Sequence, residues 1–472
     1  MADRYDAVII GAGPGGEVAL NTLLKAGRRV ALVENEVIGG ECSNWGCIPS
    51  KTLLRATELI GQCERAAGVG KPRLDFGTLA AYRDYMVSSH DDSKRVASYE
   101  KRGVTVVKDT GRIDSPGRVQ AGGRVLETDA IVVATGAEAV VPPIPGLAEA
   151  GYWTNRDATD LTAIPSSVVV VGGGAVGIEL SQFLARVGAR VSLVQGPPKL
   201  AEREAPELGD ALRDILTEDG IEVRAGVHAS AVRVDGVEKI VALDDGSELR
   251  GEVVLVATGR RPRTTGLGLE SVGIEPGKTG IEVDERCRAG EGVWAIGDVT
   301  GVAAFTHVAK YQGRIAVADI LGHDVRADYR AVPRVLFTDP EVAAVGMTEE
   351  QARAAGIDVA TATIDLPSTV ARSYTFEEHP SGRLGVVVDR QRQVLLGAWA
   401  VAPLAGEWIH IAVLAVRAEV PVPVLRDTIA QFPSFSEALG IALRGLPDLQ
   451  DDECMMDHTP HPAMDQERAG VV

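Results

Sequence analysis

The sequence predicts an α/β fold built around two Rossmann-like dinucleotide-binding units. The main observation is a glycine motif, Gly-x-Gly-x-x-Gly, which occurs twice, each time between an apolar strand-like run and a helical stretch. A second observation is a close pair of cysteines, Cys42 and Cys47, shortly after the first motif. The chain has 472 residues, which is long enough for several domains with buried cores.

The first unit begins with an apolar run at residues 7–10, which predicts a strand, and continues into the first glycine motif. Gly11 permits a tight turn, Gly13 lets backbone amides approach a pyrophosphate, and Gly16 allows the helix to pack closely on the strand. The next predicted strand ends in Glu34, at the spacing expected for an acid that accepts hydrogen bonds from a ribose 2′-hydroxyl. We therefore expect the first unit to bind a dinucleotide.

The second unit repeats this pattern after a β-branched run at residues 167–171. Its three motif glycines are Gly172, Gly174 and Gly177. Gln195 stands at the ribose-contacting position, and an amide does not repel a 2′-phosphate as an acid would. Lys199 and Arg203 follow as candidate phosphate partners, although both could equally be solvated surface charges. The pattern favours NADPH slightly over NADH.

Cys42 and Cys47 are the candidate catalytic residues, because a thiol pair beside a bound nucleotide can transfer two electrons. Five cysteines are too few and too scattered for a structural disulfide framework in a reducing compartment. The remaining three have no close cysteine partner and are predicted to be structural: Cys63, Cys287 and Cys454.

No metal site is predicted. His458 and His461 lie near Cys454, but this final segment contains prolines and mixed polar residues and is expected to be a loose tail. A zinc site needs four ordered ligands, so we expect none there.

The charge pattern excludes some classes of partner. Acidic residues outnumber basic ones by 66 to 48, and the net charge of −18 argues against nucleic acid or an anionic membrane. No apolar stretch of membrane-spanning length is present, and the first five residues lead directly into a strand without a signal peptide. These features predict a soluble, cytoplasmic protein.

The motifs resemble those of the flavin-dependent pyridine nucleotide-disulfide oxidoreductases, such as dihydrolipoamide dehydrogenase, mercuric reductase and glutathione reductase. The resemblance extends from about residue 4 to about residue 445. Besides the two glycine motifs, it rests on six blocks, at residues 46–51, 134–136, 257–262, 295–298, 306–309 and 333–341.

This resemblance implies that the first unit binds FAD and the second binds the nicotinamide nucleotide. It places Thr135, Gly136 and Gly259 where nucleotide-binding segments close, and Asp298 on the FAD ribityl chain. The family also implies a homodimer with a C-terminal α+β dimerisation domain. The implied boundaries are residues 1–148 for the first FAD part, 149–265 for the NAD(P) domain, 266–330 for the return to the FAD domain, 331–449 for the dimerisation domain and 450–472 for a flexible tail.

The resemblance further implies an electron relay from NAD(P)H through the flavin to a Cys42–Cys47 disulfide. The cysteine matching Cys47 lies nearer the flavin and holds a thiolate, and the one matching Cys42 exchanges with substrate sulfur. Lys51 and Glu179 match a family ion pair near the flavin, and Lys51 is therefore expected both to act in catalysis and to contact the cofactor.

One departure from the family limits the activity that can be inferred. Most disulfide-reducing members carry a histidine where this chain has Phe432, although the accompanying glutamate is present as Glu437. Loss of a general base costs about 10²- to 10⁴-fold in rate, so ordinary dithiol exchange should be slow at neutral pH. His410 is not assigned as a substitute, because its surroundings predict an amphipathic interface helix.

Two further departures flank Cys42. Glu41 replaces the usual threonine, and Trp45 replaces a smaller side chain. Together with Phe432 and Phe435 they suggest an apolar, aromatic-lined mouth over the redox centre. Packing of these aromatic side chains in the dimer interface is an equally good explanation.

Two enzymatic functions remain open. The first is an NAD(P)H-dependent reductase of a small or peptide-borne disulfide, or in reverse a dithiol oxidase. The alternative is a quinone reductase of diaphorase type, in which electrons leave directly from the flavin. Replacing Cys42 with serine separates the two, since only the first needs that thiol. A non-enzymatic role does not explain why the complete relay is present.

Overall fold

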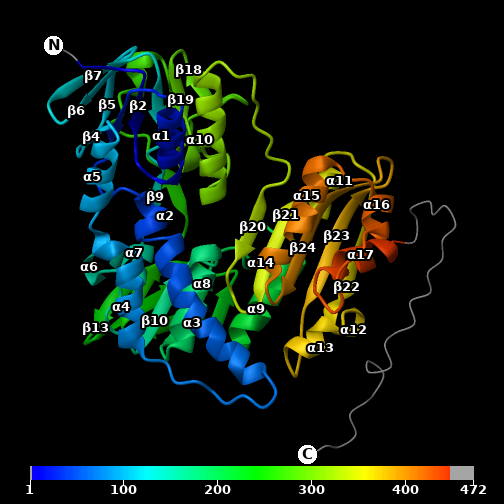
Figure 1. Cartoon of the computed structure of the whole chain (residues 1–472). Coiled ribbons are helices and arrows are strands. Elements are labelled where there is room, and N and C mark those ends of the chain that lie inside the picture. Colours follow the sequence, from blue (N-terminus) through cyan, green and yellow to red (C-terminus); the bar gives the residue numbers. More distant parts are fainter. Residues whose placement is uncertain (1–2, 447–472) are drawn as a thin grey trace, which may run out of the picture.

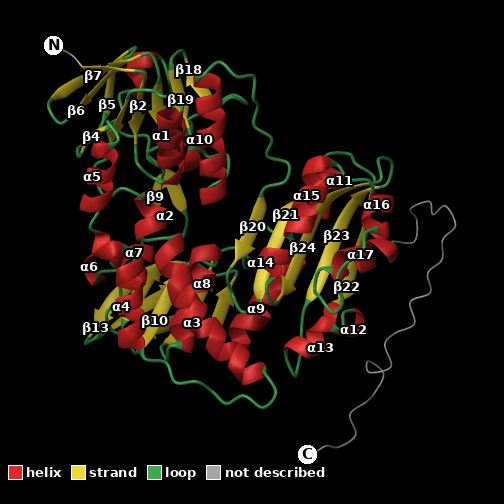
Figure 2. Ribbon diagram, in the orientation of Figure 1, coloured by secondary structure: helices red, strands yellow, loops and turns green. Residues whose placement is uncertain are grey.

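The computed structural model describes residues 3–446, and its strands form six sheets in three regions (Figures 1 and 2). The fold is mixed α/β, as predicted. The first two regions contain the glycine motifs, and the third contains the C-terminal strands and helices.

The first region is built on a six-stranded sheet, and helices cover its three central parallel strands, β8 (Ile131–Val133), β2 (Ala7–Ile10) and β3 (Val30–Val33). Its order is β18 (Arg288–Gly290), β19 (Val293–Ala295), β8, β2, β3 and β4 (Thr105–Val107). All neighbours pair in parallel except β18 with β19. Helices α1 (Pro14–Lys25) and α10 (Thr306–Ile320) pack side by side on one face, where Ile9 and Leu32 are buried.

A second sheet packs on the other face of the first, against Val8 and Ala31. Its order is β1 (Asp3–Tyr5), β7 (Arg124–Thr128), β6 (Arg118–Ala121) and β5 (Arg112–Ser115). Helices connect β3 to β4: α2 (Gly40–Asn44), α3 (Cys47–Arg65), α4 (Phe76–Met86), the 3₁₀ turn η1 (Ser88–His90) and α5 (Ser93–Lys101). Two further 3₁₀ turns follow later in the chain, η2 (Leu269–Val272) and η3 (Gly297–Thr300).

The second region contains a four-stranded parallel sheet and a three-stranded antiparallel sheet. The parallel order is β12 (Glu222–Ala225), β11 (Arg190–Gln195), β10 (Ser167–Val171) and β16 (Val253–Val256). The antiparallel strands are β13 (Ala229–Asp235), β14 (Glu238–Leu243) and β15 (Glu248–Gly251). The helices are α6 (Leu147–Ala150), α7 (Asn155–Thr159), α8 (Ala175–Arg186) and α9 (Pro206–Glu218). Strands β9 (Ala137–Ala139) and β17 (Arg260–Pro262) pair where the chain leaves and re-enters the first region.

The third region is a five-stranded antiparallel sheet covered by helices. Its order is β20 (Pro333–Leu336), β21 (Glu341–Gly346), β24 (Val394–Ala402), β23 (Arg383–Asp389) and β22 (Val359–Asp365). The helices are α11 (Glu349–Ala354), α12 (Leu366–Thr369), α13 (Arg372–Phe376), α14 (Ala405–Trp408), α15 (His410–Ala418), α16 (Val422–Asp427) and α17 (Glu437–Arg444). Helices α15 and α17 share one apolar core with the sheet.

Both glycine motifs adopt the same turn. Gly11 and Gly172 have φ of +104° and +118°, a conformation that favours glycine. A Cβ atom at Gly16 would overlap the carbonyl oxygen of Gly11, and one at Gly177 would overlap that of Gly172. Close packing of each helix on its turn therefore requires glycine at these positions.

The pairing of the strands agrees with the domain boundaries expected from the resemblance, and these boundaries stay a proposal. Strands β18 and β19 rejoin the first sheet after the second region, as expected if residues 1–148 and 266–330 form one domain interrupted by residues 149–265. The predicted tail at 450–472 lies outside the described residues.

Candidate active site

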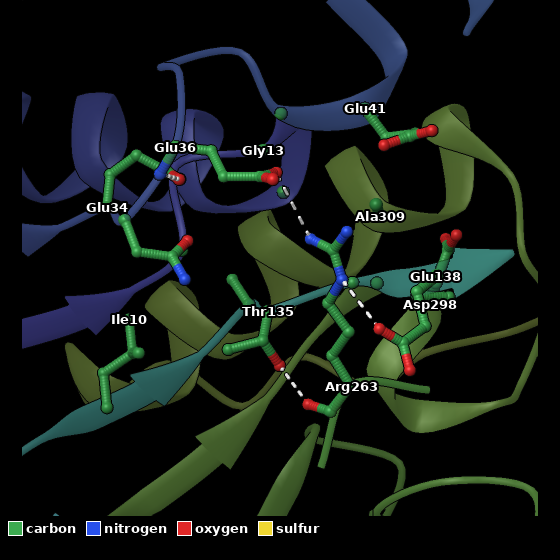
Figure 3. Close-up of a pocket in the computed structure, with 18 of the residues that line it drawn as sticks. Ile10, Gly13, Glu34, Glu36, Glu41, Thr135, Glu138, Arg263, Asp298 and Ala309 are labelled. Carbon is green, nitrogen blue, oxygen red and sulfur yellow. Dashed lines mark hydrogen bonds and ion pairs between the residues drawn. The ribbon is translucent and has the colours of Figure 1, made fainter. Parts of the chain in front are cut away.

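A cavity of about 450 Å³ opens at the carboxyl ends of the central strands of the first sheet (Figure 3). In parallel α/β sheets this is where ligands bind. The structure brings several residues predicted to bind FAD together in its lining: Gly11, Gly13, Glu34, Thr135, Gly136 and Asp298. Gly16 instead lies behind the turn, where it packs the helix.

Glu34 connects the glycine turn to the cavity wall. Its carboxylate accepts hydrogen bonds from the backbone amides of Ala12 and Glu36, both at 2.7 Å. The side chain is 7 % exposed. These bonds fix the carboxylate beside the turn, where it can accept further hydrogen bonds from a ribose.

Asp298 extends from η3 into the same cavity (Figure 3). Burial raises the pKa of its carboxyl group, and the nearby charge of Arg260 opposes this. Among the described residues no side chain donates a hydrogen bond to Asp298. A half-buried carboxyl that accepts no side-chain hydrogen bond from residues 3–446, together with open space next to Gly13, fits the hydroxyl-rich and anionic parts of FAD.

The two cysteines lie on consecutive helices, Cys42 on α2 and Cys47 at the start of α3. Gly46 joins the helices, and a Cβ atom there would lie only 3.3 Å from Cα of Cys42. Cys42 also lines the cavity. The N-terminus of α3 favours a negative charge on Cys47.

The two thiols differ in acidity. The hydrogen bond from Cys42 lowers the pKa of Cys47 to about 6, aided by Thr306 and Lys51 and opposed by burial. The Sγ atom of Cys47 lies 3.3 Å from Oγ1 of Thr306. The same bond to Cys47 raises the pKa of Cys42. In the dithiol form these opposite pKa shifts favour a thiolate on Cys47 and a thiol on Cys42.

Lys51 and Glu179 form the ion pair that the resemblance implied, with Nζ and Oε2 separated by 2.6 Å. The other oxygen of Glu179 accepts a hydrogen bond from the backbone amide of Phe337 at 2.9 Å, and Lys51 lies over the ring of Phe337. The pair joins α3, α8 and the start of the third region. Their roles beside a flavin remain a proposal.

The second glycine motif is built like the first. Oε1 of Gln195 accepts a hydrogen bond from the backbone amide of Gly173 at 2.7 Å. Lys199 pairs with Asp210 at 3.1 Å, whereas Arg203 is exposed and has no ion pair within the described residues. Gly259, in the loop after β16, has φ of +130°. Arg203 is therefore the freer of the two candidate phosphate partners.

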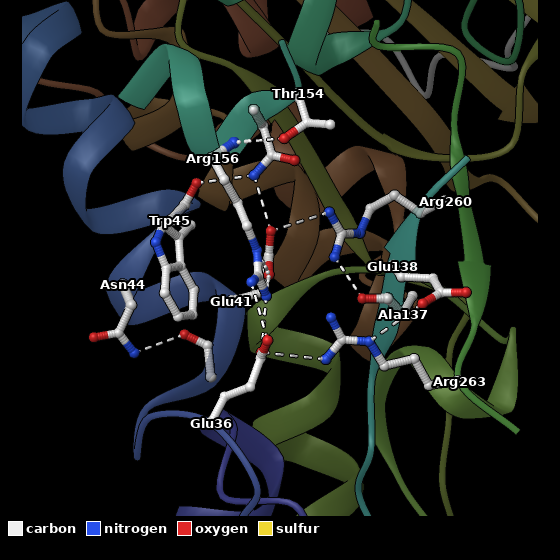
Figure 4. A network of polar contacts seen from close by, with 12 residues as sticks. Glu36, Glu41, Asn44, Trp45, Ala137, Glu138, Thr154, Arg156, Arg260 and Arg263 are labelled. Carbon is white, nitrogen blue, oxygen red and sulfur yellow. Dashed lines mark hydrogen bonds and ion pairs between the residues drawn. The ribbon is translucent and has the colours of Figure 1, made fainter. Parts of the chain in front are cut away.

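The expected aromatic mouth is wrong for Phe435, and the structure gives Glu41 and Trp45 charged and stacking partners. Phe435 is 6 % exposed and packs against Phe376 and Trp408 in the core of the third region. Trp45 is partly exposed and contacts Arg156 and His90. Glu41 is a charged member of an ion-pair network (Figure 4). Phe432 is 70 % exposed, in the loop after α16. The sequence alone did not predict the contacts of Glu41, Trp45 and Phe435.

Glu437 lies at the start of α17 and accepts a hydrogen bond from the backbone amide of Ser434 at 3.0 Å. His410 is exposed at the start of α15. Neither residue lines the cavity.

The other expected features are reported for the described residues only. Cys287 is fully buried, and burial raises the pKa of its thiol to about 12, which fits a structural role. Residues 3–446 contain no cluster of metal-binding side chains, and Cys454, His458 and His461 lie outside them. None of the helices in this part of the chain is long and apolar enough to cross a bilayer.

Sequence reasoning missed several residues of this site. Thr306 was quoted only as part of a motif, with no contact to Cys47 expected. Arg156, Arg260 and Arg263 form the ion-pair network beside the cavity with three carboxylates, those of Glu36, Glu41 and Glu138 (Figure 4). Only the Arg-Arg-Pro block near residue 260 offered a sequence signal for this network.

Comparison with known proteins agrees with this architecture. The family model described as "Pyridine nucleotide-disulphide oxidoreductase" matches residues 5–313, and that of its dimerisation domain matches residues 332–443. A mercuric reductase of Staphylococcus aureus is 34 % identical over 93 % of this chain and 82 % of its own length. A dihydrolipoyl dehydrogenase of Thermus scotoductus is 35 % identical over 94 % and 97 %. The Cu(II) complex of the HOCl-induced flavoprotein disulfide reductase RclA from Escherichia coli has a TM-score of 0.83 at 29 % identity, covering 93 % of this chain and 100 % of that one.

Proposed function

Because the chain belongs to the pyridine nucleotide-disulphide oxidoreductases, a family of FAD-dependent enzymes, we propose that it uses NADPH to reduce a disulfide substrate through Cys42 and Cys47. Bound FAD would supply two-electron exchange between the nicotinamide nucleotide and the cysteine pair. Glu34, Asp298 and the first glycine turn would hold it, and the second turn with Gln195 would hold the nicotinamide nucleotide.

The observation that carries this proposal is the placement of the cysteine pair: Cys42 lines the cavity, and Cys47 lies at the start of α3 with its sulfur 3.3 Å from Oγ1 of Thr306. Cys47, stabilised as a thiolate at the start of α3, is suited to contact the cofactor. Cys42 keeps its proton and is suited to exchange with substrate. The Cys42 thiolate would attack the substrate disulfide, forming a mixed disulfide and releasing one substrate thiolate. The Cys47 thiolate would then attack the sulfur of Cys42, forming the Cys42–Cys47 disulfide and releasing the second substrate sulfur as a thiolate.

We expect proton transfer from Cys42 to limit the rate of this reaction. Cys42 must lose its proton before it attacks, and Phe432 offers no base. Water or the leaving thiolate would accept the proton, so the reaction should accelerate with rising pH. Phe432→His should raise activity with lipoamide-like dithiols if the missing base limits them, and unchanged activity would mean that the shape of the substrate site is limiting.

The dimerisation domain supports a homodimer. Several large apolar side chains of this domain are exposed in the single chain, namely Ile411, Leu414, Val424, Ile429 and Phe432. A second copy that covers them would remove this apolar surface from water. A reducing cytoplasm is the location we propose, because the mechanism depends on a thiol pair that is repeatedly reduced.

The test is Cys42→Ser in the FAD-loaded protein. Reduction of disulfides should fall by more than about 10³-fold, because the exchanging nucleophile is lost. Reduction of a quinone should persist, because those electrons leave from the flavin. Full retention of disulfide reduction by the variant would contradict the proposal and favour the diaphorase alternative. Cys63→Ser is the matched control, since Cys63 lies outside the cavity lining.

A soft metal ion is a second candidate acceptor. One relative is named a mercuric reductase, and one solved structure is a Cu(II) complex. A thiol and a thiolate held together offer two soft sulfur ligands, and reduction of a metal ion does not need the missing base at position 432. NADPH oxidation stimulated by Hg²⁺ or Cu²⁺, and abolished in Cys42→Ser, would support this candidate. Equal stimulation in that variant would exclude it.

A further inference from the structure

A single arginine, Arg156, contacts both unusual residues of the cysteine loop (Figure 4). Its Nη2 atom lies 2.7 Å from Oε2 of Glu41, the residue directly before Cys42. Its Cζ atom lies 4.0 Å above the ring centre of Trp45, which stands between the two cysteines. Nη2 also pairs with Glu36 of the cavity wall at 2.9 Å. One cation therefore ties the loop to the wall of the nucleotide cavity.

The helix that carries Arg156 holds the same loop through other contacts. The side-chain amide of Asn155 donates hydrogen bonds to Oε1 of Glu41 at 2.9 Å and to the backbone carbonyl of Trp45 at 3.0 Å. Thr159 donates to the same carbonyl at 3.3 Å. A capping box formed by Thr154 and Asp157 fixes the first turn of this helix, α7. The short helix thus acts as a firm support for the loop.

The other face of Trp45 is covered by His90. The two rings stack with centroids 5.0 Å apart and planes inclined by 16°. His90 is held in turn by Asp160, directly after α7, at 3.1 Å. Ser88, Ser89 and His90 all have positive φ, a conformation that residues with side chains rarely adopt. The strained turn at residues 88–90 therefore lies where His90 contacts Trp45.

We propose that Arg156 is a positioning residue, and this proposal rests on the proposed function. Through Glu41 and Trp45, Arg156 holds the reduced Cys42–Cys47 loop in the conformation that the loop has when the disulfide is formed. Reduction breaks the S–S bond and takes up two electrons and one proton, leaving a thiol on Cys42 and a thiolate on Cys47. A free loop would then gain conformational freedom, which favours the dithiol. A loop held by the contacts of Arg156 with Glu41 and Trp45, here called the clamp, gains little conformational freedom on reduction. The equilibrium therefore lies further toward the disulfide, and the dithiol is a stronger reductant.

Arg156→Met tests this, because it keeps an unbranched side chain but removes the charge and the planar group. The full, FAD-loaded protein is equilibrated in buffers of graded dithiothreitol and oxidised dithiothreitol. Alkylation and mass spectrometry then give the dithiol fraction. We expect the equilibrium constant to move about tenfold toward the dithiol, which for a two-electron couple corresponds to about 30 mV. The long-wavelength thiolate–flavin absorbance of the dithiol should weaken as well. Arg156→Lys should restore only part of both, since lysine cannot bridge two carboxylates and stack on a ring.

Arg261→Met is the matched control. Arg261 is exposed and pairs with Glu138 at 2.7 Å, at the edge of the same network, without touching the cysteine loop. Its replacement should leave the dithiol fraction unchanged. Trp45→Leu removes the aromatic ring that Arg156 and His90 contact, and it keeps the Arg156–Glu41 ion pair. It should shift the equilibrium in the same direction by a smaller factor, and combining it with Arg156→Met should give less than the sum of the two effects.

The outcomes are distinguishable. A wild-type protein whose cysteines show no dithiol–disulfide equilibrium coupled to the flavin spectrum would refute the proposed function itself. A normal wild type with Arg156→Met and Trp45→Leu both matching Arg261→Met would overturn the clamp alone. If Arg156→Met fails to bind FAD, Trp45→Leu decides the question, because it leaves the ion pairs in place.

Discussion

The two nucleotide-binding units share their glycine turn but differ in the side chain that supports it. In the first unit Glu34 accepts a hydrogen bond from the amide of Ala12, and in the second Gln195 accepts one from Gly173, each at 2.7 Å. A carboxylate and an amide therefore make the same backbone contact. The comparison shows one task of this position, which is to hold the turn in place. We propose that its second task is to set the charge that a ribose or its 2′-phosphate meets.

The units differ also in how much chain surrounds the nucleotide. The first cavity is closed by segments far apart in the sequence, including Thr135, Arg263 and Asp298. In the second unit the segment after β11 carries Arg203 in an exposed position. We expect the first nucleotide to stay bound as a cofactor and the second to exchange as a substrate.

The largest expected effect comes from adding a side chain behind each turn. Gly16→Val and Gly177→Val both overlap a backbone carbonyl oxygen, and such overpacking costs about 1–3 kcal/mol of folding free energy. Gly16→Val should abolish FAD binding and give colourless protein. Gly177→Val should stay yellow, with flavin reduction by NADPH slowed by about 10²-fold or more. Absorbance and stopped-flow spectroscopy would check this, and equal FAD loss in both variants would refute the assignment of the two units.

Gln195→Glu should exchange the nicotinamide preference. A glutamate can keep the contact to Gly173, but its charge repels a 2′-phosphate, and we expect this repulsion to cost about 1.4–2.7 kcal/mol. The ratio of kcat/KM for NADPH to that for NADH should fall by about 10- to 100-fold. Gln120→Glu, at an exposed site of the first region, is the control. An unchanged ratio would mean that Gln195 does not face the ribose.

The reverse exchange, Glu34→Gln, should weaken FAD binding by about tenfold, because a hydrogen bond to a charged group is worth about 1.5–3 kcal/mol and an amide keeps part of it. The turn itself should survive, as it does around Gln195. Equilibrium dialysis of the flavin would measure the loss. FAD affinity equal to that of the wild type would show that the contact of Glu34 is structural only.

The smallest expected effect is a change in the pKa of the Cys47 thiol. The pKa of Cys47 is lowered to about 6, so its thiolate is present above that pH and is protonated below it. The long-wavelength absorbance of the reduced protein should therefore disappear as the pH falls through about 6. Thr306→Val removes one stabilising contact and should raise this midpoint by less than about one pKa unit. A band that persists unchanged to pH 4 would contradict the assignment of the thiolate.

The sequence predicted the local parts of this molecule well. The strands at residues 7–10 and 167–171 coincide with β2 and β10, because apolar runs followed by glycine turns have few alternatives. The ion pair of Lys51 with Glu179 followed from the family resemblance. The contacts of Glu41 and Trp45 could not be predicted, because their partners lie on α7 and η1 and one sequence carries no signal for such long-range contacts.

The central claim is that the cysteine pair and a flavin share electrons supplied by a nicotinamide nucleotide. Anaerobic titration with NADPH and with NADH tests it most directly. The first equivalent of NADPH should produce the long-wavelength thiolate–flavin absorbance, and NADH should do so less effectively. Reduction of the flavin without that absorbance, leaving both cysteines unable to react with a thiol reagent, would contradict the account.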